Sequence, residues 1–359
     1  MNSSSSVDLW NQLLKAKITS GEMPELQEME SPWYVRTMLG IAGWIAALFL
    51  LLFLATGLEI VLENEIAGLI VSLFMMGGAF AILRFVENND FAAQFALAFS
   101  FAAQVLFVVS IAEILDPYDG VVFFAVSFME IFLAAVIMNS IHRIWSSFAA
   151  TLAFSMGLAY YSIHFVQIAL LLLAVASIWL NEFRHAKYYR MLSSAGYGFT
   201  LSLIYQQSSK YFYSYIMHEF MSSEKQKMLF APWMGEVLSG LVFLGVVYVL
   251  LKRENIKPRD PIFIVVMVSV FLLSLASLKA SGIACGIVII LLGFSGGNRI
   301  LIGLGISSLI FYLSTYYYML NTTLLVKSGV LGISGIILIS AMFAIRYFAK
   351  ISKGVHNAE

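Results

Sequence analysis

Few residues in this sequence could do chemistry, and the most notable of them is an acidic residue inside an apolar stretch. Glu130 follows Ser127, Phe128 and Met129 in the apolar stretch from residue 120 to 141. An ionised carboxylate in hydrocarbon is costly unless it is protonated, paired or wetted, so intramembrane carboxylates are candidates for function. Glu130 is therefore either a functional group or part of a structural hydrogen bond, and the sequence leaves both interpretations open.

Two further charged residues are candidate partners for this carboxylate or for each other. Glu236 and Lys327 are each expected near the outer end of another apolar stretch. Opposite charges stabilise one another in an apolar medium, so we predict that Lys327 pairs either with Glu130 or with Glu236.

The sequence lacks the motifs of the common enzyme and cofactor classes. No glycine-rich nucleotide loop, hydrolase nucleophile elbow or zinc-protease helix is present. The single cysteine, Cys285, excludes an internal disulfide and a thiolate metal cluster. The five histidines lack the paired spacing of metal ligands. We predict no enzyme activity, cofactor or metal site, although a membrane enzyme could assemble its site from distant residues.

The elements that must position these residues are long apolar stretches. Hydrophobic residues make up 60% of the chain and charged residues 12%, with a mean hydropathy of +0.88. A helix of about 20 apolar residues matches the hydrocarbon thickness of a bilayer. We predict an all-α, polytopic transmembrane helical bundle in the lipid bilayer, with about twelve spans. These are residues 38–58, 66–83, 91–112, 120–141, 144–162, 163–181, 191–207, 235–251, 261–278, 280–298, 300–320 and 324–345.

The distribution of charge predicts the orientation of the chain. With the N-terminus in the cytoplasm, most of the 21 Lys and Arg residues fall in cytoplasmic connections, as the positive-inside rule requires. We therefore expect both termini in the cytoplasm. The net charge of 0 argues against nucleic-acid binding. The stretch 144–181 forms either two spans or one long tilted helix.

The transmembrane domain, residues 38–349, is flanked by two polar segments and interrupted by one loop. We expect residues 1–37 to form a polar, amphipathic cytoplasmic segment and residues 350–359 a cytoplasmic tail. Residues 208–234 form an extracytoplasmic loop in which Tyr213 and Tyr215 stand among charged residues, a mixture typical of an interfacial helix. These tyrosines either contact a partner protein or anchor the helix at the membrane surface.

The stretches at 261–278 and 280–298 are short, and a turn at Lys279 joins them. The second stretch carries Gly282, Gly286 and Gly293. Helices that break inside the membrane form binding sites in transporters, whereas small residues also allow close helix packing. Both interpretations remain open for these glycines.

Motifs near the two ends of the chain resemble a known family. The first is Ser31-Pro32-Trp33-Tyr34-Val35-Arg36 leading into Gly43-Trp44, and the second is Gly297-Asn298-Arg299 with Leu301 and Gly303. Tyr316-Tyr317-Tyr318, Leu320, Thr322-Thr323-Leu324-Leu325 and Lys327-Ser328 complete the pattern. Together they resemble the bacterial domain of unknown function 4401 family over most of the chain.

The resemblance implies an integral protein of a bacterial inner (cytoplasmic) membrane without an established activity, often encoded beside a small protein with a Gly-Asp-Tyr-x-x-Leu-x-Tyr motif. Such a neighbour would dock on the outer surface, where the 208–234 loop and Tyr316, Tyr317 and Tyr318 are expected. Consecutive tyrosines at the end of a span also serve as interfacial anchors.

Two functions of different classes follow. The preferred one is a membrane-embedded scaffold or sensor that acts with an extracytoplasmic or anchored partner, because one mid-depth carboxylate is little for a carrier of charged substrates. The alternative is a secondary transporter or carrier with a site near Glu130. The sequence does not indicate an oligomeric state.

Overall fold

A computed structural model describes residues 10–16, 33–57, 64–86, 89–115, 120–161, 163, 166–220 and 232–319, with isolated positions between 325 and 339. Over these ranges the chain is all-helical, as predicted, and has no strand. The helices are α2 (Trp33–Gly57), α4 (Glu65–Phe85), α5 (Asp90–Leu115), α6 (Val121–Val136), α7 (Ser140–Tyr160), α8 (Val166–Leu180), the 3-10 helix η1 (Glu182–Tyr188), α9 (Tyr189–Phe220), α10 (Pro232–Arg253), α11 (Pro261–Ser277), α12 (Ile283–Ser295) and α13 (Arg299–Met319).

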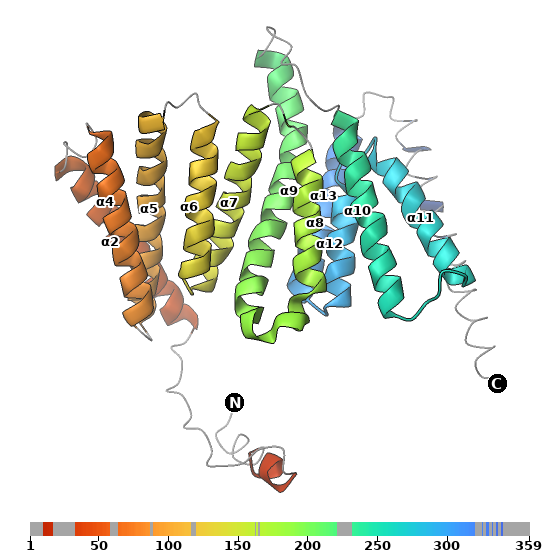
Figure 1. Cartoon of the computed structure of the whole chain (residues 1–359), viewed down its shortest axis with the longest axis horizontal. Helices are drawn as coiled ribbons and strands as arrows, with labels where there is room; N and C mark the ends of the chain where they lie inside the picture. Colours follow the sequence, from red (N-terminus) through yellow and green to blue (C-terminus); the bar gives the residue numbers. More distant parts are fainter. Residues whose placement is uncertain are drawn as a thin grey trace.

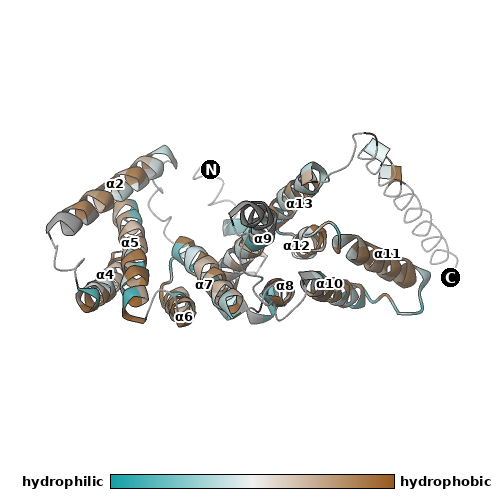
Figure 2. Ribbon diagram, turned by 90° about the horizontal axis from the view of Figure 1, so that it is seen from above, coloured by the Kyte–Doolittle hydropathy of each residue, from teal (hydrophilic) through white to brown (hydrophobic). Residues whose placement is uncertain are grey.

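The helices stand side by side in an elongated row (Figure 1). Seen from above, α2, α4 and α5 lie at one end of the row and α10 and α11 at the other, with α7 and α9 in the middle (Figure 2). The row has two apolar cores, one around Met75, Met129 and Ile137 and a larger one around Leu172 and Val288. The packing of α7 on α9 joins the halves that surround these cores.

The apolar surface of the helices agrees with a membrane environment. Large side chains point outward without cover, among them Phe74, Phe128 and Phe294, each at least 74% exposed. Among the residues that the structure describes, four helices are long and apolar enough to cross a bilayer: Glu65–Phe85, Asp90–Leu115, Trp233–Arg253 and Arg299–Met319. Five further helices in the described ranges are apolar but shorter. These helices indicate a membrane protein, while the count of twelve spans and the orientation of the termini stay predictions.

The stretch 144–181 forms two helices rather than one. Helix α7 ends at Tyr160 and α8 begins at Val166. The amide of Tyr161 donates back to the carbonyls of Ala159 and Gly157, which ends α7 in a tight turn. The structure thus confirms the two-helix interpretation and excludes a single long tilted helix.

Helix α9 is longer than the predicted span at 191–207. It runs without a break to Phe220, so its 32 residues cover about 48 Å, compared with about 30 Å for the hydrocarbon layer. Its C-terminal part projects above the other helices in Figure 1. Tyr213 and Tyr215 belong to this projecting part, but their side chains lie outside the described residues.

Candidate functional site

Glu130 is buried between helices in the first half of the row. It lies on α6 and only 3% of its surface is exposed. The carboxyl of Glu130 forms a side-chain hydrogen bond with Ser146 of α7. One oxygen of the Glu130 carboxyl, Oε2, is buried and has no hydrogen-bond partner within the described part of the chain. A buried carboxyl with one oxygen unsatisfied is costly and calls for an explanation beyond packing.

A chain of hydrogen bonds leads away from Glu130 through Ser146. The Ser146 Oγ lies 3.3 Å from Nδ1 of His142, one turn earlier on α7. On the other side of the ring, His142 Nε2 lies 2.8 Å from Ser100 Oγ and 3.2 Å from Gln104 Nε2, both on α5. The chain therefore links side chains of α6, α7 and α5, all at most 6% exposed.

The connection between α6 and α7 positions the imidazole of this chain. Asn139 caps α7, and its Oδ1 accepts from the amides of Ile141 and His142 at 3.0 and 3.1 Å. This cap fixes the first turn of α7, where His142 lies. Next to it, the guanidinium of Arg143 donates to the carbonyls of Ala134 and Ile137 at the end of α6, at 2.7 and 2.9 Å.

Glu236 belongs to a separate cluster in the second half of the row. It lies on α10, is 6% exposed, and contacts Gln207 of α9, Ser277 at the end of α11 and Ser281 in the turn that follows. The Gln207 amide donates to its Oε1 at 3.1 Å, and Ser277 donates to its Oε2 at 3.3 Å. Ser281 also donates to Oε1.

The predicted site residues are therefore not brought together. Glu130 and Glu236 lie in different halves of the row, each with its own polar neighbours. Lys327 lies outside the described residues, so both predicted ion pairs stay predictions. Tyr316, Tyr317 and Tyr318 end α13, where Tyr318 is 79% exposed.

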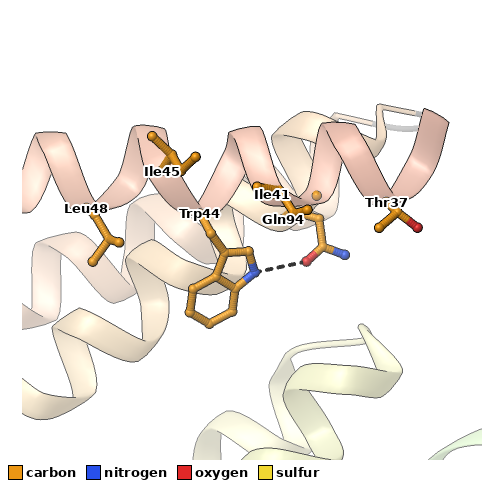
Figure 3. Close-up of a pocket in the computed structure, with 7 residues that line it drawn as sticks. Thr37, Ile41, Trp44, Ile45, Leu48 and Gln94 are labelled. Atoms are coloured by element: carbon orange, nitrogen blue, oxygen red, sulfur yellow. Dashed lines mark hydrogen bonds between the residues drawn. The ribbon is translucent and has the colours of Figure 1, made fainter. Parts of the chain in front are cut away.

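A groove lies between α2 and α5 at the first family-like motif (Figure 3). Its volume is about 510 Å³ and its lining includes Thr37, Ile41, Trp44 and Leu48. The Trp44 indole donates to Oε1 of Gln94 at 3.3 Å across the groove, as Figure 3 shows. A Cβ at position 43 would lie only 2.9 Å from the Phe95 amide nitrogen. Because Gly43 has no Cβ, helix α2 can approach α5 this closely.

The second motif forms the tight turn between α12 and α13. Gly297 has a φ of 66°, a left-handed conformation that favours glycine. Asn298 then caps α13, with its Oδ1 accepting from the Leu301 amide at 3.1 Å. Its Nδ2 donates at 2.7 Å to the Tyr197 hydroxyl of α9.

Both motifs thus hold helices together, and they belong to a match that covers most of the chain. The family described as Domain of unknown function (DUF4401) matches residues 32–347. The chain belongs to the DUF4401 family. No curated protein and no solved structure matches it.

In this DUF4401 protein, the polar groups around the two carboxylates were missed by sequence reasoning. His142, Ser100, Ser277 and Ser281 carried no motif, and Gln104 reads as a residue that joins neighbouring helices. One signal was available: Ser100 and Gln104, like His142 and Ser146, are four residues apart and therefore share a helix face.

Asn298→Ala is expected to destabilise the DUF4401 domain by about 1–2 kcal/mol, because it removes the cap of α13 and the bond to α9. Thermal unfolding of the detergent-solubilised protein measures this loss. Asn298→Asp should retain the cap and lose only the bond in which Nδ2 donates to Tyr197, and so fall in between. The exposed Ser307 on the same helix provides the control, and an equal loss in Ser307→Ala would contradict the assignment.

Proposed function

We propose that the protein is a multi-pass carrier of the bacterial inner membrane in which Glu130 takes up and releases a proton during transport. The observation that carries this proposal is the buried, unsatisfied Oε2 of Glu130 at the end of a hydrogen-bonded chain. In the proposed topology of about twelve spans with both termini cytoplasmic, the 137–139 connection faces the cytoplasm. Intramembrane carboxylates joined to histidine are typical of proton relays in carriers.

The order of groups in the chain supports proton movement along it. A carboxyl, a hydroxyl and an imidazole follow one another at Glu130, Ser146 and His142. The hydroxyl of Ser146 can accept a proton from one neighbour while it donates its own to the other. Since His142 is in the first turn of α7, the chain would connect the middle of α6 with the predicted cytoplasmic side.

The proton-carrying role of Glu130 can be tested with dicyclohexylcarbodiimide, an apolar reagent that modifies protonated carboxyl groups. We expect mass spectrometry to find Glu130 modified in the folded protein, more strongly in acidic than in alkaline buffer. The exposed Glu65 at the start of α4 provides the internal control and should remain unmodified. A folded protein in which Glu130 is never modified, or is modified equally at all pH values, would contradict the proposal.

The carrier role itself requires a functional readout. In a strain that lacks the gene and shows a growth defect, the wild type is expected to restore growth and Glu130→Gln to fail, although both fold. Glu130→Asp retains a carboxyl and should restore growth in part. Full rescue by Glu130→Gln would instead favour a scaffold, whose function does not depend on this carboxylate.

The projection of α9 supports a second proposal, a scaffold or sensor that binds an extracytoplasmic partner. The helix extends beyond the other helices (Figure 1), and Tyr318 near the end of α13 is exposed. Exposed aromatic residues are enriched at the centres of protein interfaces. The small protein with a Gly-Asp-Tyr-x-x-Leu-x-Tyr motif is the proposed partner, and co-purification that Tyr318→Ser weakens and Glu130→Gln preserves is the expected result.

A further inference from the structure

The cluster around Glu236 gathers oxygen atoms from several elements at one buried point. Besides the three bonds to its carboxylate, Gln207 Nε2 donates at 2.7 Å to Ser281 Oγ. Ser277 and Gln207 are each 0% exposed. The set therefore contains one carboxylate, two hydroxyls and one amide, contributed by α9, α10, α11 and the turn after α11.

The amide of Gln207 leaves this cluster incompletely satisfied. Its Oε1 is buried and has no hydrogen-bond partner in the ranges that the structure describes. The two ends of a side-chain amide are nearly the same in shape, so the group can turn over without a change in packing. Turned over, Oε1 would face the Glu236 carboxylate and Ser281, and a cation between these oxygens would make that arrangement favourable.

The backbone supports this arrangement with a break between two helices. Helix α11 ends at Ser277, and α12 begins at Ile283 after Gly282, whose φ is 93°. A Cβ on Gly282 would lie 2.8 Å from the Tyr312 ring and 3.0 Å from Cγ of Gln207, so glycine allows both side chains to close over the turn. In secondary transporters, unwound backbone within a span coordinates coupling cations. The turn between α11 and α12 similarly places non-helical backbone next to the Glu236 cluster.

We propose that this cluster is a sodium site, with Glu236 as the charged ligand and Gln207, Ser277 and Ser281 as neutral ligands. One carboxylate balances the charge of one monovalent cation, and hydroxyl and amide oxygens are hard ligands that suit such an ion. Lys279 is the charged residue of the intervening turn, and this residue is exposed. The site goes beyond the proton-carrying role of Glu130 and does not depend on it.

The test uses the full-length protein in detergent and follows its unfolding temperature at constant ionic strength. A cation that binds only the folded state raises this temperature as its concentration increases. We expect sodium chloride to raise it saturably, and choline chloride and potassium chloride to raise it much less. Glu236→Gln should abolish the sodium effect, whereas the matched Glu130→Gln should retain it. If Glu130→Gln fails to restore growth but keeps the rise of the unfolding temperature with sodium, the two proposals are independent of each other.

A second variant covers the case in which Glu236→Gln does not fold. Ser277→Ala removes one ligand and should weaken the apparent sodium affinity at least about tenfold, which corresponds to about 1.4 kcal/mol. Binding of radioactive sodium to the purified protein provides an independent measure of the same affinity. Equal stabilisation by sodium and choline would overturn the proposal, as would an unchanged sodium response in Glu236→Gln. Either result would leave Glu236 with a structural role in the hydrogen-bonded cluster.

Discussion

Gly198→Ala is expected to lower the stability of the protein by about 3 kcal/mol, because the new methyl group would be forced against backbone. A Cβ at this position would lie 2.4 Å from the Ile144 carbonyl oxygen, 2.7 Å from Ser147 Cβ and 3.0 Å from the Phe148 amide. Backbone atoms cannot rotate out of the way as a side chain can. The helices α7 and α9 must therefore move apart, and with them the halves of the row that they join.

The thermal midpoint of the protein in detergent measures this effect, with Gly245→Ala as the matched control. Gly245 is also inside a helix, α10, but has nothing within 4 Å of its Cβ position. Alanine there should be neutral or slightly stabilising, because it has the higher helix propensity. If both substitutions lower the midpoint alike, the close contact between α7 and α9 is not what makes Gly198 important.

The helical class of this protein was predictable from hydropathy, because a chain in hydrocarbon must satisfy its backbone hydrogen bonds within each segment. The break between α7 and α8 was also predictable, since keeping Arg143 and Arg184 on one side requires two helices there. The extension of α9 was not. Residues 208–220 mix aromatic and charged side chains, which suggested a separate interfacial helix, yet nothing in them ends the helix that precedes them.

The candidate sites were predictable only in part. Glu130 and Glu236 stand out in the sequence because a carboxylate is rare in an apolar stretch. Their neighbours are serine, glutamine and histidine, which are common enough in membrane helices to carry no signal alone. Which of them meet depends on the rotation of each helix about its axis. That rotation is set by close contacts such as the one at Gly198, far from the carboxylates in sequence.

Polar side chains concentrate on the two central helices, which explains why these helices look least like membrane spans. Helix α7 buries His142, Arg143, Ser146 and Ser147, and α9 buries Thr200, Ser202 and Gln207. Their polar groups bond within the bundle instead of facing lipid. Among the described helices, α4, α5, α10 and α13 are the four that meet the criteria of length and composition for crossing a bilayer.

Arg143→Met is expected to destabilise the protein by about 2–6 kcal/mol, since it leaves two carbonyl groups inside the protein without a donor, at about 1–3 kcal/mol each. The last carbonyls of a helix have no partners within that helix. At the end of α6 the Arg143 guanidinium supplies the missing donors: its Nε donates to the Ala134 carbonyl and its Nη2 to the Ile137 carbonyl. Methionine fills a similar volume but donates no hydrogen bond.

Arg143→Lys separates the effect of charge from that of geometry. An ammonium retains the charge but cannot place two fixed donors as the planar guanidinium does, so lysine should recover only part of the loss. Arg84 at the end of α4 provides the matched control, because it is exposed, and Arg84→Met should change the unfolding midpoint little. Full recovery by lysine would show that charge, rather than the paired hydrogen bonds, stabilises the end of α6. Arg143→Met should also weaken the chain of hydrogen bonds that joins Glu130, Ser146 and His142, because Arg143 fixes the connection that positions His142.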